Sequence, residues 1–363
     1  MSADLHTKVH HWLYDLALPF WAKTGIDPKG LGAWEALSHD GEPLVDRDKR
    51  IRVHPRQAYV FAKAAAHGEV QYLDVAQGLF DYTMRHGMDE KSSFLVAVTK
   101  PDGSTAGRPH ELYDLAFVLL ACAALTEAGR PQTDALMRAT QALEVLDTET
   151  GWANNLARRL PRAQNPYMHM FEATTELYVA TGDEAWKAKA AMILELFKTR
   201  FLRADGAVLE FFAEDWTSLT ENQQVEPGHI LEWIWLLDQY AHATDTEIDV
   251  DIAGMFRKAS DAMTDLGLFT DTQEPVSDTC RLWPQCEALK ASIVLERRGM
   301  GLPARVSSDQ LVAQMFESYF NTPVTGGWFD KLDTSGAVIS TDMPSSSFYH
   351  IYVALKAYLD HRA

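Results

Sequence analysis

The sequence predicts an all-α fold in which six helical hairpins form an inner ring of helices inside an outer ring. Short β-hairpins are expected in the long loops on one face. Proline marks the repeat: six prolines are separated by 54, 57, 61, 57 and 60 residues, and each opens a stretch typical of a buried helix. Proline suits the first turn of a helix, where its missing N–H has no intrahelical partner. The regular start signal, at Pro55, Pro109, Pro166, Pro227, Pro284 and Pro344, indicates an array of helical hairpins.

Helical periodicity is the second observation, and it recurs along the whole chain. In each predicted hairpin the first helix is amphipathic and charged, whereas the second is apolar almost all round, as in HILEWIWLLDQY at 229–240. A helix that is apolar on all sides is usually buried, so the second helices form the inner ring. The predicted helices are 3–22, 55–67, 69–87, 110–129, 131–147, 166–181, 184–202, 227–243, 249–267, 284–299, 306–321 and 344–361.

The third observation is that the loops are unequal. Connections from an inner to the next outer helix are short, such as TGDE at 181–184, and the reverse connections are long. Three long loops, at 92–107, 200–216 and 326–342, alternate around a DG or SG turn and predict β-hairpins. Long loops on one face of a rigid scaffold are where sites tend to be built. The same face receives the starts of the inner helices.

Bulk composition bounds the function. With 363 residues, 47% of them apolar, the chain can bury a large core, and nothing resembling a linker divides it, so we expect one catalytic domain over 1–363. The formal charge of −18 argues against nucleic acid and anionic membranes as partners. No apolar run reaches membrane-spanning length, and the first residues lack a signal-peptide pattern. We expect a cytoplasmic protein, and the sequence does not distinguish a monomer from a homodimer.

Cysteine usage predicts neither disulfides nor a metal site. Cys122, Cys280 and Cys286 form an odd, sparse set, which indicates a reducing compartment. Cys280 and Cys286 are six residues apart with no adjacent cysteine or histidine, and no acidic or histidine cluster has metal-ligand spacing along the chain. We therefore expect no metal and no cofactor.

Histidines and carboxylates stand near the starts of the predicted inner helices. His229, His350 and His169 titrate close to neutral pH and could take and return a proton. Glu232 follows His229 by three residues, and Glu172 follows His169 by three, so each carboxylate shares a helical face with its imidazole. A carboxylate in that position can orient an imidazole and favour its protonated form. These residues are candidates for proton transfer at the mouth of the barrel.

A cation and several aromatic rings complete the candidate site. Arg56 supplies a permanent positive charge with a forked donor geometry suited to sugar or enediolate oxygens. Tyr113, Trp233, Trp283 and Trp328 offer flat apolar surfaces on which a sugar ring can pack. The inner helices would also direct their N-terminal N–H groups at the same mouth, which favours a developing anion.

Structural roles are the competing interpretation for each residue taken singly. A histidine near a helix start is more often a cap, and a tryptophan in an apolar helix is more often part of the core. Joint placement favours function: five helices carry His, Arg or Glu within their first two turns, on segments otherwise too apolar to bury charge cheaply. The combination predicts a polar pocket inside the barrel.

Six stretches resemble the N-acylglucosamine 2-epimerase family, which includes mannose isomerases and cellobiose 2-epimerases. The resemblance extends through all but about the first fifty residues and implies an (α/α)6 barrel, in agreement with the helical pattern. The stretches are PRQAYVFA (55–62), ELYDLAF (111–117), NPYMHMFEATTELYVATGD (165–183), VEPGHILEWIWLL (225–237), RLWPQCEALKA (281–291) and DMPSSSFYHIYVAL (342–355).

The resemblance also implies residue roles. His229 and His350 match the two histidines that move protons at C1 and C2 of an open-chain sugar, and Arg56 matches the pocket arginine. Substrate-contacting positions of the family fall on Tyr113, Asn165, His169, Glu232, Trp283 and Glu287. Two positions depart from the pattern of many relatives: Gln223 and Gln224 stand where an arginine precedes VEPGH, and Leu115 replaces a histidine of some mannose isomerases.

The function expected from the sequence is an aldose–ketose isomerase that converts a free aldohexose, D-mannose, to D-fructose through a cis-enediolate, with a monosaccharide as its partner. His350 is the expected base at C2 and His229 its partner. A sugar 2-epimerase is the alternative. A glycoside hydrolase on the same barrel is a third interpretation, with its carboxylate pair drawn from Glu172, Glu232, Glu287 and Asp342. The last interpretation is a binding protein that catalyses no reaction.

Overall fold

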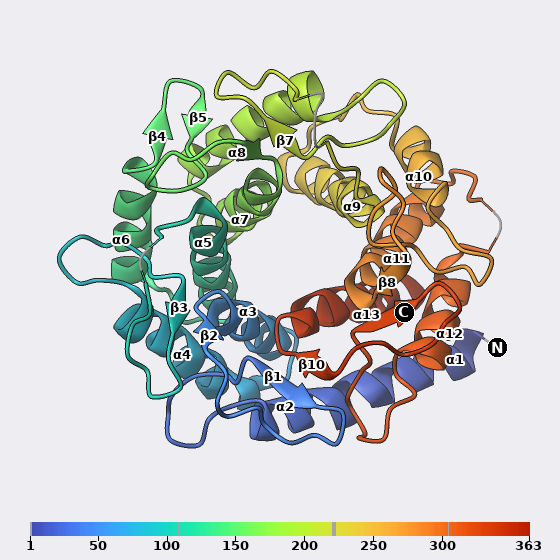
Figure 1. Ribbon diagram of the computed structural model, residues 1–363, viewed down its shortest axis with the longest axis horizontal. Coiled ribbons are helices and arrows are strands. Elements are labelled where there is room, and N and C mark those ends of the chain that lie inside the picture. The colour runs from blue at the N-terminus through green and yellow to red at the C-terminus, as the bar shows by residue number, and fades with distance from the viewer. Residues whose placement is uncertain (1, 108, 220–222, 304) are drawn as a thin grey trace.

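The computed structural model describes residues 2–107, 109–219, 223–303 and 305–363 and has the architecture of an (α/α)6 barrel. Inner helices surround the barrel axis, and outer helices surround them in turn (Figure 1). Consecutive inner helices contact one another, and the last contacts the first, so the inner ring is closed. The inner helices are α3 (Val53–Ala66), α5 (Leu112–Glu127), α7 (Asn165–Thr181), α9 (Pro227–Thr244), α11 (Leu282–Arg297) and α13 (Ser347–Arg362).

The outer ring is less regular. Three of its described members contain a π-helical segment, and in one of these a short 3-10 helix, η2 (Val70–Tyr72), directly precedes the α-helix. The outer segments are α1 (Ser2–His10), η1 (His11–Ala17) and α2 (Leu18–Thr24); α4 (Leu73–Tyr82) and η3 (Thr83–Gly87); α6 (Thr133–Glu144); α8 (Glu184–Leu196) and η4 (Phe197–Phe201); α10 (Ile252–Ser260); and α12 (Ser308–Ser318).

The predicted helix pattern is confirmed, with three local differences. Helix α10 ends at Ser260 and not near 267, because residues 263–269 form a tight turn that needs the positive φ of Gly267 (+85°). Pro109 and Pro344 precede their helices by three residues and do not lie in the first turn. Pro344 instead ends a β-strand.

Helix ends follow the expected chemistry at several positions. Pro227 is the first residue of α9 and Pro166 the second residue of α7. Helix α7 ends at Gly182 in the left-handed conformation, and Asp183 then caps α8 by accepting a hydrogen bond from the Ala185 N–H. Ser307 and Gln310 form a capping box at the start of α12. Gly182 and Asp183 keep the turn from α7 to α8 short.

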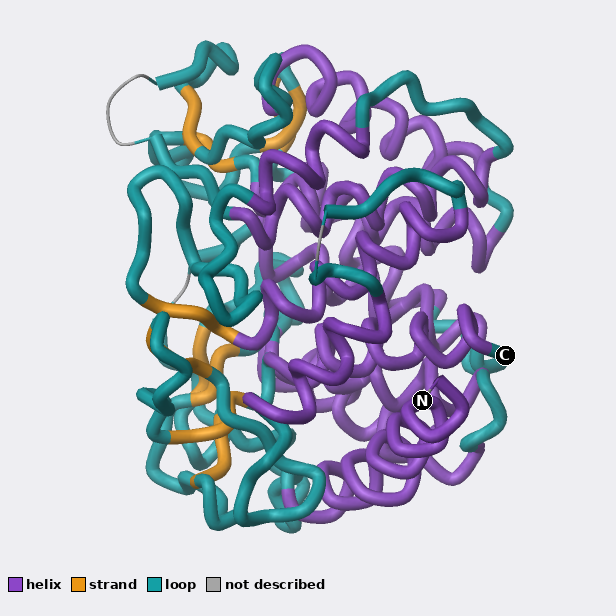
Figure 2. The backbone as a smooth tube through the Cα atoms, turned by 90° about the vertical axis from the view of Figure 1, so that its right-hand side faces the viewer, coloured by secondary structure: helices purple, strands orange, loops and turns teal. Residues whose placement is uncertain are grey.

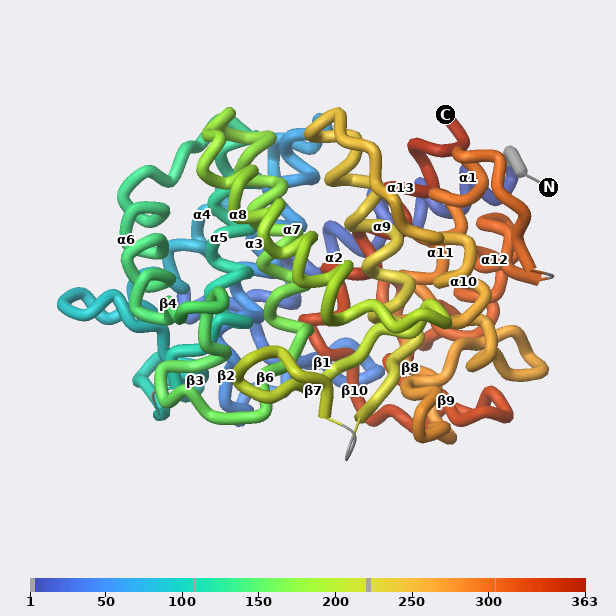
Figure 3. Tube along the Cα trace, turned by 90° about the horizontal axis from the view of Figure 1, so that it is seen from above, coloured from blue at the N-terminus to red at the C-terminus, as the bar shows by residue number. Residues whose placement is uncertain are grey.

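The long loops join one another through short antiparallel ladders. Strands and loops gather on one side of the molecule, opposite the C-terminus (Figures 2 and 3). Only β4 (Asp147–Thr148) and β5 (Gly151–Trp152) pair within one loop, whereas the other ladders of the described residues join two different loops. These are β1 (Ala36–Ser38) with β10 (Asp342–Pro344), β2 (Lys49–Arg50) with β3 (Val98–Thr99), β6 (Arg162–Ala163) with β7 (Phe211–Phe212), and β8 (Thr279–Arg281) with β9 (Lys331–Asp333).

The predicted local hairpins are present only as single bridges, Thr99 to Thr105, Leu202 to Val208 and Leu332 to Val338. The core lies between the helical rings and is rich in stacked aromatic side chains. None of the described helices has the length and apolar character needed to cross a membrane.

Candidate active site

A polar cavity of about 390 Å³ opens at the end of the barrel where the inner helices begin. Every lining residue lies in the first two turns of an inner helix or in the loops of the same face. The structure brings eight of the twelve predicted site residues to this cavity: Arg56, Tyr113, Asn165, His169, His229, Glu232, Trp283 and His350. Since these residues come from all six inner helices, the closed ring is what assembles them.

His229 is the third residue of α9, and a carboxylate from a loop holds its imidazole. Its Nδ1 lies 2.7 Å from Oε1 of Glu210 and 3.7 Å from Oε2 of Glu226. Burial lowers the pKa of His229, but the two carboxylates outweigh burial and raise it to about 10. His229 is therefore an imidazolium at neutral pH. Glu232, the partner expected from helical spacing, points elsewhere.

His350 is the fourth residue of α13, and its Nδ1 lies 2.7 Å from Oε1 of Glu287. Burial, together with the cations Arg56 and Lys290, lowers the pKa of His350 well below its ordinary value. His350 is therefore neutral near pH 7. With Nδ1–H donated to Glu287, the Nε2 lone pair is left for a substrate.

The indole of Trp283 contacts both of these histidines. Its ring centroid is 5.3 Å from that of His229 and 5.6 Å from that of His350. One cavity thus holds a protonated and a neutral imidazole around a flat apolar surface. Titratable groups whose surroundings move their pKa values apart are the usual arrangement of an acid and a base.

Arg56 supplies the fixed positive charge of the cavity. It is 6% exposed, donates a hydrogen bond of 2.6 Å to the Tyr113 hydroxyl, and stacks over the Phe117 ring, with 4.0 Å from guanidinium carbon to ring centroid. Its Nε has no hydrogen-bond partner among the described residues. A buried guanidinium with free donors is suited to an anionic oxygen.

His169 and two glutamates form a second buried group deeper in the barrel. Its Nδ1 lies 3.5 Å from Oε2 of Glu172 and 3.9 Å from Oε1 of Glu232. Burial lowers the pKa of His169, and burial together with Glu287 raises the pKa of Glu232 to about 7. Glu232 Oε1 has no hydrogen-bond partner in the described part of the chain. His169 and Glu232 can each exchange hydrogen bonds with sugar hydroxyls.

Asn165 is the first residue of α7 and also faces the cavity. Its Oδ1 is buried and has no hydrogen-bond partner within the described ranges. An unpaired buried acceptor is costly, so a hydroxyl group of a bound ligand would satisfy it. This atom supports the predicted role of Asn165 as a substrate contact.

Gly228 controls the position of Trp283. A Cβ atom at this position would lie 2.4 Å from the Trp283 ring. We expect Gly228→Ala to displace the indole and reduce kcat/KM by about a hundredfold, since a shift of about 1 Å at a reacting centre can cost that much. Gly78→Ala is the matched control, because Gly78 also lies in a helix and a Cβ atom there would meet open space. Steady-state kinetics of both variants test this, and equal activities would contradict it.

Four predicted site residues lie outside the cavity. Glu172 and Glu287 stand behind it, where each contacts a histidine. Trp233 is fully buried, stacks on Phe197 at 4.2 Å between centroids and donates to Gln164. Trp328 is equally buried between Trp21 and Phe348. Both tryptophans face the space between the helical rings, so their position is that of core residues.

Sequence reasoning missed several residues that shape the site. Glu210 was detectable, because Val208, Glu210 and Phe212 alternate as the buried positions of an extended segment. Lys290 follows Glu287 by three residues on an otherwise apolar helix, a spacing that also signals a pair. Glu226 precedes His229 by three residues, which is the same kind of signal. Arg50, Arg281 and Asp330 line the cavity from the loop face and had no such signal. His110 is structural: its two ring nitrogens contact the Leu95 N–H and the Ala142 carbonyl.

Among the residues that the structure describes, three buried or half-buried groups have ligand atoms close enough to hold a metal ion. Within each group the atoms lie within 4.8 Å of one another. The groups are His169, Glu172 and Glu232; Glu210, Glu226 and His229; and Glu232, Glu287 and His350. Sequence spacing could not detect them, because each combines residues from different elements. A contact between a histidine and a carboxylate already occupies part of each group, and Lys290 stands 2.6 Å from Glu287, where it would oppose a second cation.

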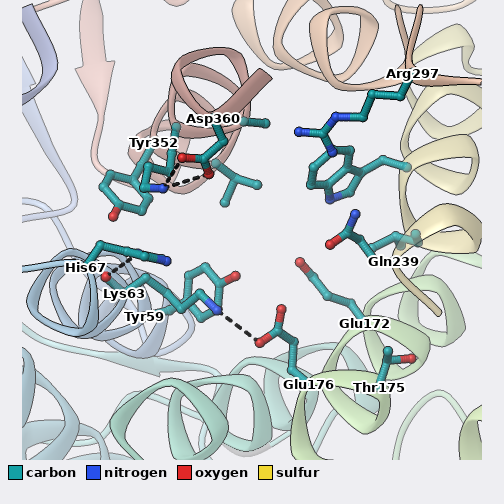
Figure 4. Close-up of a pocket in the computed structure, with 15 residues that line it drawn as sticks. Tyr59, Lys63, His67, Glu172, Thr175, Glu176, Gln239, Arg297, Tyr352 and Asp360 are labelled. Atoms are coloured by element: carbon teal, nitrogen blue, oxygen red, sulfur yellow. Dashed lines mark hydrogen bonds and ion pairs between the residues drawn. The ribbon is translucent and has the colours of Figure 1, made fainter. Parts of the chain in front are cut away.

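A second cavity, of about 220 Å³, lies at the opposite end of the barrel (Figure 4). Glu172 lines this cavity, and its Oε2 lies 3.5 Å from Nδ1 of His169. Lys63 pairs with Glu127 and Glu176, and Lys356 pairs with Asp360. His67, its one histidine among the described residues, bonds a backbone carbonyl and has its pKa lowered by burial. The mouth cavity is therefore the candidate active site.

Comparison with known proteins gives a consistent family. The profile described as N-acylglucosamine 2-epimerase (GlcNAc 2-epimerase) matches residues 32–354. The chain is 34% identical to a mannose-6-phosphate isomerase of Rhizobium meliloti (strain 1021), over 98% of this chain and 97% of that protein. It is 27% identical to a D-mannose isomerase of Thermobifida fusca, over 89% and 87% of the two chains.

Solved structures show the same fold. The cellobiose 2-epimerase from Spirochaeta thermophila DSM 6192 superposes with a TM-score of 0.86, covering 99% of this chain and 97% of that one. Sequence identity in this pair is 19%. At that identity the likeness concerns the (α/α)6 barrel alone.

Proposed function

This chain belongs to the N-acylglucosamine 2-epimerase family, and from that premise we propose that it is an aldose–ketose isomerase converting free D-mannose to D-fructose. It is a sugar isomerase or epimerase, as its relatives named mannose isomerase and 2-epimerase are. The finer assignment depends on one observation. An imidazolium, His229, and a neutral imidazole, His350, line one cavity, and both pack against the indole of Trp283.

The proton chemistry follows from this pair. The sugar binds with its reducing end between the histidines, and His229 donates its proton to the ring oxygen O5 and takes one from O1, which opens the ring. Nε2 of His350 then removes the proton from C2. The electron pair moves into the C1–C2 bond, and the C1 carbonyl oxygen becomes the enediolate oxygen.

The enediolate is the species to be stabilised. Arg56 and the N-termini of the inner helices bring positive charge to it inside a buried cavity. His350 returns its proton to C1, and His229 exchanges protons between the two oxygens, so that the C2 oxygen becomes the ketose carbonyl. C1 is reduced and C2 is oxidised within the same sugar, so the sequence of proton transfers balances without an external oxidant or reductant.

A free sugar is favoured over a phosphorylated one by the charges at the cavity rim. Arg50 and Arg281 are the outer cations, and both already bond carboxylates, Glu35 and Asp271 respectively. A phosphate group bound there would share each guanidinium with the carboxylate that already neutralises it. One relative bears the name mannose-6-phosphate isomerase, so mannose 6-phosphate is the second substrate to test.

Epimerisation is the second candidate function. If His229 gives its proton to C2 from the face opposite His350, the product is the C2 epimer, and several relatives are named 2-epimerases. Hydrolysis has less support. Of the carboxylates Glu172, Glu232, Glu287 and Asp342, Glu232 alone lines the cavity, and Asp342 bonds Arg47.

Proton NMR in D2O separates these functions. The protein is incubated with mannose, mannose 6-phosphate, cellobiose and N-acetylglucosamine in turn. Fructose formed from mannose supports the isomerase, and glucose deuterated at C2 supports the epimerase. Faster turnover of mannose 6-phosphate than of mannose would overturn the free-sugar assignment. Absence of both C2 exchange and product with every aldose would overturn the proposal as a whole.

A further inference from the structure

A fully buried lysine stands behind the neutral histidine. Lys290 and Glu287 lie three residues apart on α11, and both side chains are 0% exposed. Nζ of Lys290 is 2.6 Å from Oε2 of Glu287, and the other carboxylate oxygen is 2.7 Å from Nδ1 of His350. The three residues form a continuous line from the barrel interior to the cavity. Lys290 does not itself line the cavity.

Lys290 affects which tautomer His350 adopts, because it affects the ionisation of Glu287. If Glu287 is a carboxylate, Nδ1 of His350 carries the proton and Nε2 has the free lone pair. If Glu287 is a neutral acid, it donates to Nδ1, and the proton of the imidazole moves to Nε2. In that tautomer Nε2 cannot accept a proton from C2. Burial disfavours the carboxylate, and a nearby cation offsets that effect.

The groups around Glu287 leave its ionised and neutral forms close in free energy. Burial raises the pKa of Glu287 to about 7 even with the lysine in place. Two further carboxylates, Glu172 and Glu232, interact with Lys290 and oppose a negative charge on Glu287. The charged and titratable groups around the pair come from four other helices: Arg56 on α3, His169 and Glu172 on α7, His229 and Glu232 on α9, and His350 on α13.

We propose that Lys290 is a positioning residue for the reaction: it holds Glu287 as a carboxylate and thereby keeps His350 in the tautomer that serves as the C2 base. This inference rests on the proposed function, since it assigns a purpose to the Nε2 lone pair. It makes Lys290 a determinant of kcat that never touches the sugar.

Lys290→Met tests the proposal through its pH dependence. Without the lysine, Glu287 needs a higher pH to ionise, so the acidic limb of the kcat profile moves to higher pH. We expect kcat to fall at least about tenfold at pH 7, less than the roughly 10⁴-fold cost of a wrong tautomer in a serine protease triad. The deficit should shrink above pH 9, and KM should stay near the wild-type value.

Two variants serve as references. Lys290→Arg keeps the positive charge. It should recover part of kcat, and the acidic limb of its pH profile should stay near the wild-type position. Lys63→Met also removes a mostly buried lysine of an inner helix that pairs with glutamates. Lys63 lies at the far end of the barrel, so this variant should leave the pH profile of kcat unmoved. If Lys290→Met does not fold, Lys290→Gln is measured instead, because its amide can still bond Glu287 without a charge.

The outcomes separate the two claims. A loss of kcat that is the same at every pH, or a change confined to KM, overturns the role of Lys290 while leaving the isomerase intact. A wild-type protein that neither exchanges C2 protons nor isomerises any aldose overturns the proposed function, whatever the variants do.

Discussion

His350→Asn is expected to lower kcat by about 10²–10⁴-fold, the usual range for a lost general base. Asparagine can still donate to Glu287, so the fold and the sugar contacts should persist while the basic nitrogen is gone. Exchange of the C2 proton with D2O should fall by the same factor, because His350 is the proposed base for that step. Thermal unfolding should show a stable variant. Measuring kcat and C2 exchange together distinguishes a chemical loss from a binding loss.

The matched control is His361→Asn, at the other end of the same helix. His361 bonds Glu296 and lies far from the cavity, so its replacement should leave kcat unchanged. If His350→Asn retains kcat within tenfold of the wild type, His350 is not the base and the mechanism must be abandoned.

His229→Asn is expected to cost a similar factor by a different route. It removes the acid that serves O5 and O1, so ring opening and the exchange of protons between enediolate oxygens both slow. C2 exchange with a substrate supplied in open-chain form should be less impaired than turnover of the cyclic sugar. The comparison of the two substrates by NMR is the measurement. Equal impairment of both would contradict the role in ring opening.

Glu210→Gln tests the same role of His229 by changing the pKa of its imidazole while the imidazole stays in place. Wild-type activity that depends on protonated His229 is present below pH 10 and lost as pH rises through about 10, where His229 deprotonates. Removing the charge of Glu210 lowers that pKa, so the alkaline limb of the kcat profile should move to lower pH. His242→Asn, on an exposed turn at the far end of α9, should leave the limb in place. If the alkaline limb does not move in Glu210→Gln, that limb reports the titration of another group.

Much of the fold could be predicted because it depends on local patterns. Helical periodicity in α5 or α9, and the proline starts of α7 and α9, depend on residues near one another in sequence. The loop ladders could not be predicted this way, since β1 pairs with β10 across three hundred residues of chain. Alternation in a loop indicates an extended strand but does not identify its partner.

The candidate site also contains features that local sequence predicts and features that it does not. Residues in the first turns of inner helices, such as Arg56 and His350, could be placed at the mouth from sequence alone. Their partners could not: helical spacing suggested Glu232 for His229, yet Glu210 from a loop bonds it. Protonation states were beyond sequence reasoning as well, because burial and several distant charges together decide them. The opposite pKa shifts of two similar histidines arise only in the assembled barrel.

The ladders between loops have a practical consequence for engineering. Each two-stranded ladder that joins different loops ties an active-site loop to its neighbour, and β1 with β10 ties the first long loop to the last. Grafting a single loop from a relative with another substrate preference would leave the partner strand with unmatched backbone groups. Exchanging both loops of one ladder as a unit keeps that pairing. The natural module for altering specificity is therefore the pair of loops, although its two halves are far apart in the gene.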